Sequence, residues 1–454
     1  MYRSGRTTDE PVPPFTKKWE WVPPHGEWMA GHVQPVIANN TVVVGSNGGY
    51  IYGISGGPNG NGSTLWEYRT GGPIAHTAAL ANVGGGWKAF VGSCDGHLYC
   101  LNLSNGSLVW RYRARGAILV APLHVQDKVY IGDTRGYLHC VETVTGVATW
   151  ETRLGPSIKS CPTYGNNGRI FVGTEDMFAH CVSTATGSKL WSRHLPGQGF
   201  MLYWPVYSSA TDHVVFRTRK ITPNGQDVME DDIIAILRRH PDAHNNDAYY
   251  TTAQQEIRDY YTARPWLRTF HILNASTGQE AFVAPVANIG RHQDCPNPPV
   301  LHHDGGFMVC IRTRRSDWYG FSFASGQDEN GDWGTIVPSF AKLNTATGLF
   351  ERIAPYRSFS TGSGRMCCDD MSQFTIAGNY FVMNHRITSV NHISTRQQTV
   401  IRQNDYTGIT WTQGNGNTDN TSHGYNPVVV SDGILYIHDA SVESGATGSV
   451  AAIQ

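Results

Sequence analysis

The sequence has few charged residues, and the charges that it has are nearly balanced. Only 16% of its 454 residues are charged, and the formal net charge is −1 at pH 7. Nucleic acids and anionic membranes select surfaces on which Lys and Arg are clustered. The composition therefore predicts neither a nucleic-acid partner nor binding to an anionic membrane.

Long apolar runs are also missing. No stretch approaches the roughly 18 apolar residues that are needed to span a bilayer, so we expect no transmembrane segment. Residues 1–18 are polar and rich in proline, and they lack the apolar core of a secretory signal. Either such a signal was removed from this chain, or the protein is not exported by that route.

Motifs built from cysteine are missing too. The nine cysteines are an odd number, so they cannot all pair within one chain. Their spacing matches no zinc ribbon, and no C-x-x-C-H haem motif occurs. These absences exclude the common cysteine-based metal and haem classes.

Glycine and aromatic residues, in contrast, are abundant and recur with a period near 40 residues. Residues 91–110 read VGSCDGHLYCLNLSNGSLVW, and residues 131–150 read IGDTRGYLHCVETVTGVATW. Each copy contains a β-rich run, a glycine turn, an alternating run, a second glycine turn and a Trp. Strands joined by tight turns form an antiparallel meander. A repeat of this length with one Trp is typical of a propeller blade.

The glycine of the second turn allows the blades to be counted. It recurs at Gly62, Gly106, Gly146, Gly187, Gly278, Gly348 and Gly408. An aromatic residue follows it by four positions at Trp66, Trp110, Trp150, Trp191 and Phe282, and by three at Trp411. The intervals between the first four glycines are 44, 40 and 41 residues and the later ones are longer, so the later blades carry insertions.

The two ends of the chain supply the last blade. Residues 427–454 contain three strands but no outer strand, and residues 17–21 form an isolated strand with the expected Trp. We therefore predict an all-β, eight-bladed β-propeller of four-stranded antiparallel blades, with the last blade completed by the N-terminal strand. Such a ring leaves no sheet edge open between its ends.

The domain limits follow from this count. We expect residues 1–16 to be an N-terminal tail and residues 17–454 to be one propeller. An insertion at 220–268 contains two predicted helices, at 231–239 and 251–262, which we expect to cap the central funnel. A second insertion, at 314–335, is rich in Gly, Ser and Asp and predicts a surface loop.

The repeat also has a family resemblance. The pattern V-Y-V-G-x-x-D-G-x-L-Y-A-L-D-x-x-T-G-x-x-x-W, which residues 129–150 and 170–191 match best, resembles the repeat of quinoprotein-type (PQQ-repeat) β-propellers. That family includes PQQ-dependent alcohol dehydrogenases and cofactor-free scaffold propellers such as the outer-membrane assembly lipoprotein. The resemblance implies a periplasmic, cell-surface or secreted location, but a fold alone does not decide between these functions.

Chemistry, if present, is expected where the inner strands begin, because all of them begin at one mouth of the central channel. Imidazole and carboxylate groups are ligands of transition metals, and the candidate ligands are His32, His76, His292, Asp294 and His423. A second interpretation stays open, because channel mouths are wet and any ring of eight loops gathers polar groups there.

Two adjacent cysteines give a sharper candidate site. Cys367 and Cys368 can form a vicinal disulfide, and they are followed by Asp369. The resemblance implies such a pair beside the quinone of PQQ alcohol dehydrogenases, where it lies early in the chain rather than in the seventh blade. The candidate cofactor-binding residues are Cys367, Cys368, Asp369, Lys159, Trp204 and Arg365. The calcium-ligand and catalytic aspartate motifs of those enzymes are not recognisable, so no catalytic residue is assigned.

Two functions follow from these observations. The first is a non-enzymatic binding or scaffold propeller, without a cofactor, that presents its loop-rich face and helical cap to a protein or cell-surface partner. The alternative is an oxidoreductase that binds PQQ with calcium, or a transition metal, in the funnel.

Overall fold

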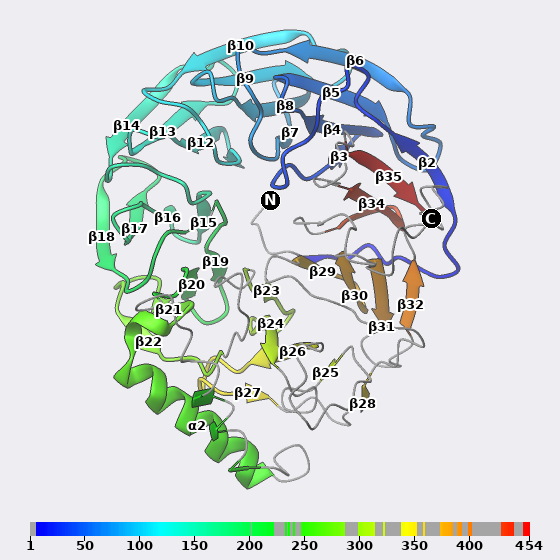
Figure 1. Ribbon diagram of the computed structural model, residues 1–454. Helices are drawn as coiled ribbons and strands as arrows, with labels where there is room; N and C mark the ends of the chain where they lie inside the picture. Colours follow the sequence, from blue (N-terminus) through cyan, green and yellow to red (C-terminus); the bar gives the residue numbers. More distant parts are fainter. Residues whose placement is uncertain are drawn as a thin grey trace.

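The strands form eight sheets arranged as a ring around a central axis (Figure 1). The computed structural model describes residues 6–200, 202–221, 232–233, 235–236, 239–240, 247–286, 298–313, 321–322, 337–351, 357–358, 373–384, 388–392, 398–401, 428–439 and 448–454. The predicted all-β propeller of eight blades is confirmed.

The first five blades follow one plan, in which four antiparallel strands succeed one another from the axis outward. Blade one contains β3 (Val36–Ala38), β4 (Thr41–Gly45), β5 (Tyr50–Ser55) and β6 (Thr64–Arg69). Blade two contains β7 (Ala79–Val83), β8 (Gly86–Gly92), β9 (His97–Asn102) and β10 (Leu108–Arg113). Blade three contains β11 (Leu123–Val125), β12 (Lys128–Gly132), β13 (Tyr137–Glu142) and β14 (Ala148–Arg153). Blade four contains β15 (Thr163–Gly165), β16 (Arg169–Gly173), β17 (Phe178–Ser183) and β18 (Lys189–His194), and blade five contains β19 (Val206–Ser208), β20 (His213–Arg217), β21 (Phe270–Asn274) and β22 (Glu280–Phe282).

The next two blades depart from the predicted four strands. Blade six contains β23 (Val300–Leu301), β24 (Phe307–Thr313), β26 (Val337–Leu343) and β27 (Phe350–Glu351), and it adds β25 (Phe321–Ser322) and β28 (Arg357–Ser358). Blade seven contains β29 (Gln373–Ala377), β30 (Tyr380–Asn384), β31 (Thr388–His392) and β32 (Gln398–Ile401), and β1 (Arg6–Thr7) pairs parallel to β29 on its inner edge.

The outermost described strand of blade seven is β32, and it pairs with β31. It ends at Ile401, before the predicted turn at Gly408. Gly408 and Trp411 lie outside the described residues, so their assignment to a turn and an outer strand stays a prediction.

Blade eight is closed by the two ends of the chain, as predicted. It contains β33 (Val429–Ser431), β34 (Ile434–Asp439), β35 (Ser449–Ile453) and, outermost, β2 (Lys17–Trp21). β2 is antiparallel to β35, with Lys17 opposite Ile453 and Trp21 opposite Val450. Next to this pair, the backbones of Thr16 and Gln454 exchange hydrogen bonds of 2.6 and 2.9 Å.

The stretch before β2 was expected to be a tail, but its described part contacts blades seven and eight. Thr7 accepts a hydrogen bond from the backbone N–H of Gly378, and Oε1 of Glu10 accepts one of 2.9 Å from that of Asn379. Phe15 packs against a buried cluster that both blades share. Residues 6–16 therefore extend the closure of the ring from blade eight to blade seven.

The blades adhere through an aromatic side chain on each outer strand, which packs over the turn glycine of the next blade. Nε1 of Trp66 donates a 2.7 Å hydrogen bond to the carbonyl of Leu103, and a Cβ added to Gly106 would lie 2.6 Å from the Trp66 ring. The same contact occurs in five more pairs: Trp19 with Gly62, Trp110 with Gly146, Trp150 with Gly187, Trp191 with Gly278 and Phe282 with Gly348. We call these six contacts the seam.

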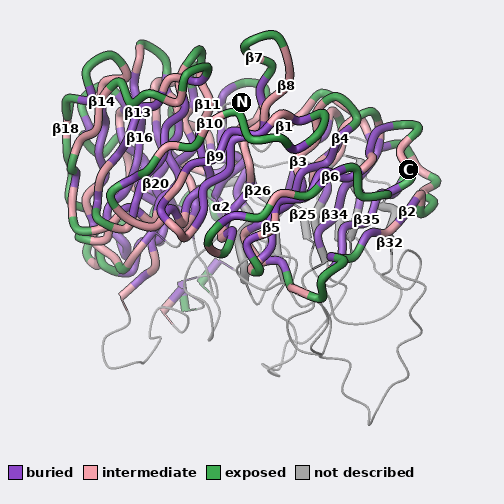
Figure 2. The backbone as a smooth tube through the Cα atoms, turned by 90° about the horizontal axis from the view of Figure 1, so that it is seen from above, coloured by how far each residue is buried: buried purple, intermediate pink, exposed green. Residues whose placement is uncertain are grey.

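The cores of the blades are apolar layers between neighbouring sheets. Cys100, Cys140 and Cys181 recur at one position and are buried free thiols. Burial raises the pKa of Cys100 and Cys181 to about 12, so these thiols stay protonated. Figure 2 shows that buried residues follow the strands and that most exposed residues lie in the turns at the two ends of the blades.

The insertion in blade five forms helix α2 (Asp247–Ala263) and the short 3-10 helix η2 (Pro265–Leu267). The helix predicted over 251–262 is therefore confirmed and begins four residues earlier. Its Gln254 side chain hydrogen-bonds both backbone groups of Phe350 in β27, at 2.6 and 3.5 Å.

The position of α2 differs from the prediction. Because β22 and β27 are outer strands, α2 lies at the circumference between blades five and six (Figure 1) rather than over the funnel. Its apolar residues Ile257 and Tyr261 pack there with Ile233, Ile236 and Phe350. The expected cap over the funnel is wrong, because the apolar side of the helix finds its partners on the outside of the ring. Most of the second insertion, 314–335, lies outside the described residues.

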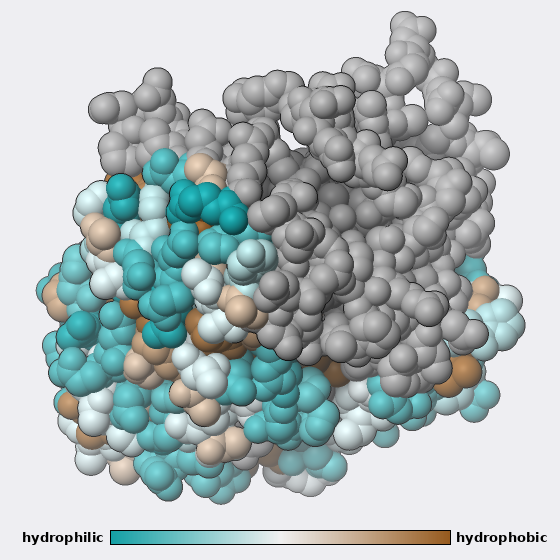
Figure 3. Space-filling model, turned by 90° about the horizontal axis from the view of Figure 1, so that it is seen from below, coloured by the Kyte–Doolittle hydropathy of each residue, from teal (hydrophilic) through white to brown (hydrophobic). Residues whose placement is uncertain are grey.

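The surface offers no large apolar area on the side that Figure 3 shows. Hydrophilic residues cover most of the described part of this side, and hydrophobic residues are scattered among them. Among the described residues, no helix combines the length and the apolar character that crossing a membrane requires.

Candidate functional site

Four of the predicted site residues lie in the described part of the chain: His32, His76, Lys159 and Trp204. The others lie outside the described residues, and the list is His292, Asp294, Arg365, Cys367, Cys368, Asp369 and His423. The metal site and the cofactor site therefore remain predictions. What the structure describes is the part of the funnel that blades one to five supply.

The inner-strand starts of these blades do converge, as the propeller geometry requires. Nε2 of His76 lies 3.1 Å from the carbonyl oxygen of Leu202 and 3.4 Å from Sγ of Cys161. The thiol of Cys161 donates to the same carbonyl at 3.2 Å, and it accepts a 3.3 Å hydrogen bond from the N–H of Ala121. Residues from blades two, three, four and five thus meet at one point near the axis.

His32 joins this point from blade one. Its ring is stacked on that of His76, with centroids 5.8 Å apart, and it meets the ring of Tyr203 edge-on at 5.6 Å. Burial, followed by the nearby charges of His76 and Arg217, lowers the pKa of His32 to about 3. His32 is therefore neutral at physiological pH. We call His32, His76, Cys161, Leu202 and Tyr203 the axial cluster.

The hydrogen bonds determine what the axial cluster can do. Nδ1 of His76 accepts a 2.9 Å hydrogen bond from the N–H of Thr77, so Nε2 carries the proton and donates to Leu202. Leu202 has a φ of +61°, which is rare for a residue other than glycine. Its carbonyl is held in this conformation by two donors. The imidazole and the thiol thus join blades, and neither directs a free lone pair at a shared metal position.

Lys159 and Trp204 occupy different places. Nζ of Lys159 forms an ion pair of 3.4 Å with Glu175, and its side chain is 43% exposed. Trp204 packs against the buried group of Val120, Ala121 and Cys161, next to the axial cluster. Among the residues that the structure describes, no group of three or more His, Cys, Asp or Glu side chains could hold a metal ion.

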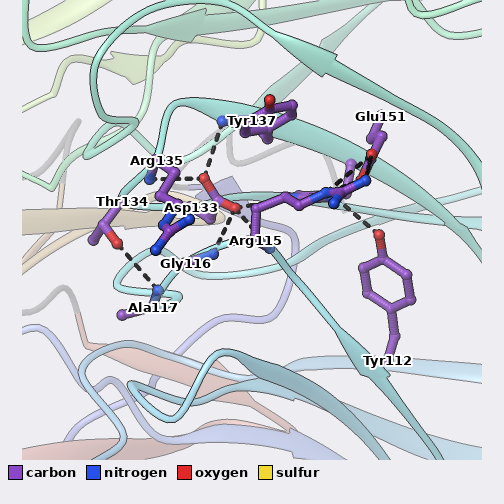
Figure 4. Close-up of polar contacts among 10 residues, drawn as sticks. Tyr112, Arg115, Gly116, Ala117, Asp133, Thr134, Arg135, Tyr137 and Glu151 are labelled. Atoms are coloured by element: carbon purple, nitrogen blue, oxygen red, sulfur yellow. Dashed lines mark hydrogen bonds and ion pairs between the residues drawn. The ribbon is translucent and has the colours of Figure 1, made fainter.

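A second buried polar group, centred on Asp133, was missed by the sequence analysis. Asp133 is fully buried, and its carboxylate accepts hydrogen bonds from the N–H groups of Arg115 (3.0 Å), Gly116 (2.9 Å), Arg135 (2.9 Å) and Tyr137 (3.0 Å) (Figure 4). This side chain ties the connection between blades two and three to the β12–β13 turn.

The Asp133 carboxylate is also paired with a buried histidine. Nε2 of His139 lies 3.0 Å from Asp133, and Nδ1 accepts a 3.0 Å hydrogen bond from the hydroxyl of Tyr112. Burial alone would raise the pKa of Asp133, but hydrogen bonds from His139 and from the backbone outweigh it and lower this pKa. Burial raises the pKa of Tyr112 to about 12, so this hydroxyl is a poor nucleophile.

The neighbouring blades explain this group. His180 is hydrogen-bonded to Thr174 at 2.9 Å, and His271 is hydrogen-bonded to Thr218 at 3.0 Å. In both blades the histidine is on the third strand and the threonine comes before it, at the positions that His139 and Asp133 occupy in blade three. The Asp133 group is therefore one version of a repeated structural contact. The signal in the sequence was the His of the third strand, six residues after the turn residue in blades three and four.

Comparisons with known proteins agree with the fold. A family model described as "Outer membrane protein assembly factor BamB" matches residues 58–136 and 134–220. No curated protein matches the chain by sequence.

Three solved structures are similar over nearly the whole chain. BamB from Moraxella catarrhalis is 13% identical with a TM-score of 0.52, covering 97% of this chain and 98% of that one. A europium-containing methanol dehydrogenase is 11% identical with a TM-score of 0.57, covering 99% and 96%. The quinohemoprotein alcohol dehydrogenase from Comamonas testosteroni is 12% identical with a TM-score of 0.59, covering 99% and 78%. At these identities the likeness concerns the fold alone. The chain has the fold of the PQQ-repeat β-propellers, and the family model recognises their repeat in residues 58–220.

Proposed function

We propose that this protein is a non-enzymatic binding or scaffold propeller that acts outside the cytoplasm and holds a protein or cell-surface partner. The family model that matches residues 58–220 carries the name of an outer-membrane assembly factor, which supports both the scaffold function and the location. The fold is shared with enzymes, so the proposal depends on the residues of this chain.

The observation that carries the proposal is the use of the axial side chains. His76 and Cys161 are the described residues best suited to bind a metal on the axis, and their polar atoms are hydrogen-bonded to the backbone of Leu202. The buried imidazole of His32 packs against His76 and Tyr203. In this part of the funnel, these side chains join five blades, as expected of a rigid scaffold.

A second candidate is an oxidoreductase with PQQ and calcium, or a transition metal, in the funnel. Two of the similar structures are dehydrogenases, one named for europium and one named as a quinohemoprotein. The adjacent Cys367 and Cys368 also favour it. Of the two described candidate residues for the cofactor, Trp204 packs next to the axial cluster, whereas Lys159 is paired with Glu175.

Three measurements on one purified sample separate the candidates. We expect no quinone absorption band and no stoichiometric copper, iron, calcium or lanthanide by elemental analysis. Intact mass with and without reductant tests for a vicinal disulfide, which leaves the mass two units lower before reduction. A quinone band or a stoichiometric metal would reverse the order of the two candidates.

The matched control is the His76→Gln variant. If a metal is bound through the predicted ligands, this variant should lose it while the wild-type protein keeps it. Equal metal contents in the two proteins would indicate adventitious binding.

A further inference from the structure

The first four blades carry a repeated pair of side chains that no step above has used. The last residue of each outer strand is an arginine or a histidine, and it lies directly opposite an aromatic residue that begins the third strand. The four pairs are Arg69 with Tyr50, Arg113 with His97, Arg153 with Tyr137 and His194 with Phe178. The four outer-strand residues are exposed and the four rings are half-buried. We call this series the cation–aromatic arc.

The arc lies on one face of the ring. In a four-stranded meander the outer strand ends on the face where the next inner strand begins, so the arc lies on the face of the funnel mouth, towards the circumference of the ring. Consecutive blades are connected along it, because Arg115, which follows the outer strand of blade two, lies 5.9 Å over the Tyr137 ring of blade three. Arg69 lies 5.2 Å over Tyr50. A guanidinium held over an aromatic ring keeps its donors directed outward.

The positive charge on the arc is not compensated within the described part of the chain. Arg69, Arg113 and Arg153 are exposed, and none of them forms an ion pair with a described carboxylate. A chain with a net charge of −1 thus gathers unpaired arginines on one edge.

The carboxylates along the same edge, in contrast, already have partners. Asp95 accepts hydrogen bonds from Gly71 and Tyr99, at 2.8 and 2.6 Å, and Asp133 is buried. Glu151 is paired with Arg115, and Glu175 with Lys159. The carboxylates therefore do not neutralise the three arginines of the arc.

We propose that the cation–aromatic arc binds an acidic, extended polypeptide segment of the partner. This inference rests on the proposed scaffold function and adds a surface and a partner chemistry to it. Arginine presents a planar fork of donors that matches a carboxylate in a bidentate pair. One arginine on each of the first three blades, at a constant register, suits a segment whose acidic side chains lie along several blades.

A nucleic acid fits the arc less well. Its phosphates form a continuous line of negative charge and require a strongly basic surface. On this edge, Glu151 and Glu175 lie between the arginines of successive blades, and they would repel such a line. A polypeptide can place neutral residues opposite these carboxylates.

The test uses the whole purified chain and a fluorescein-labelled oligoglutamate as the probe, with fluorescence anisotropy as the readout. We expect the probe to bind and its affinity to fall as salt is added, because exposed charge pairs are screened. The Arg113→Glu/Arg153→Glu double variant should bind about tenfold more weakly, as expected when unpaired cations are reversed in sign. The control is Lys189→Glu, which reverses an exposed cation at the opposite end of the outer strand β18.

The outcomes are distinct. Absence of binding to the wild-type chain, or equal affinity of the double variant and the Lys189→Glu control, would overturn the proposal. Tighter binding of a labelled oligonucleotide or an oligouronate than of the oligoglutamate would overturn the polypeptide partner. Circular dichroism of each variant verifies that it is folded. Arg153→Lys should restore part of the affinity lost in Arg153→Gln, because lysine keeps the charge but not the bidentate fork.

Failure of this proposal can be distinguished from failure of the proposed scaffold function. A chain that contains a stoichiometric quinone but binds oligoglutamate at the arc contradicts the scaffold function alone. A chain without quinone or metal that does not bind the probe contradicts the arc alone.

Discussion

The seam at the circumference and the cluster on the axis hold the same blades together in opposite ways. At the seam, each blade uses the same two residues, an aromatic ring and a glycine, in six successive contacts. On the axis, each blade contributes a different side chain, such as the imidazole of His76 or the thiol of Cys161. The seam contact is the same in each of the six blade pairs, whereas the contacts on the axis differ from blade to blade.

The largest effect is expected from opening the ring. A truncated chain that begins at residue 23 lacks β2, and it exposes the edge of β35 and removes the contact of Trp19 with Gly62. An unpaired edge strand is a template for aggregation, so we expect insoluble or oligomeric protein in size-exclusion chromatography. A soluble monomer with an unchanged melting temperature would contradict closure by the N-terminal strand.

The next largest effect is expected at one contact of the seam. Trp66→Ala removes a ring that is 7% exposed and its hydrogen bond to Leu103. Emptying a buried aromatic site costs about 3–5 kcal/mol in the free energy of unfolding, which urea denaturation measures. Trp28 is 51% exposed, and Trp28→Ala should cost less than about 1 kcal/mol. Equal costs at the two positions would show that the seam does not carry the stability of the ring.

A smaller effect is expected at the seam glycines, where glycine is favoured both by a left-handed backbone and by the lack of room for a Cβ. Gly106 has a φ of +70° and no room for a Cβ, whereas Gly85 has a φ of +84° and no atom within 4 Å of an added Cβ. Gly85→Ala should cost about 1–2 kcal/mol for the left-handed backbone alone. Gly106→Ala should cost about 2 kcal/mol more, because an overpacked contact with Trp66 must be displaced. Equal losses in urea denaturation would show that only the backbone conformation selects glycine here.

The same comparison explains what could be predicted from the sequence. The glycine spacing and the aromatic residue four positions later are local and repeated, so they predict the blade count and the pairing of β2 with β35. The position of α2 could not be predicted, because an apolar helix face is equally compatible with the funnel and with the outside of β27. The pairing of β1 with β29 involves two residues on each strand, too few for a periodic signal.

The axial cluster could be predicted from the sequence only in part. The sequence predicted that the inner-strand starts meet, and His32 and His76 do meet. It could not predict that Cys161 and His76 share the carbonyl of Leu202, because that contact depends on the left-handed backbone of one residue in a loop. The Asp133 group was missed for a similar reason, since most of its partners are backbone N–H groups of two separate loops.

The smallest effect at neutral pH is expected on the axis, where it appears only on acidification. The pKa of His32 is lowered from 6.5 to about 3, first by burial and then by His76 and Arg217. Above pH 6.5 this imidazole is neutral in both the folded and the unfolded chain, so it adds no pH dependence. As the pH falls from 6.5 towards 3, the unfolded chain binds a proton that the folded chain does not, and the free energy of unfolding decreases.

His32→Gln should therefore match the wild-type stability within about 1 kcal/mol at pH 7 and lose less stability than the wild-type protein at pH 4.5. Parallel pH profiles for the wild-type protein and His32→Gln would show that His32 is not buried in its neutral form, and that the axis at this blade is open to solvent.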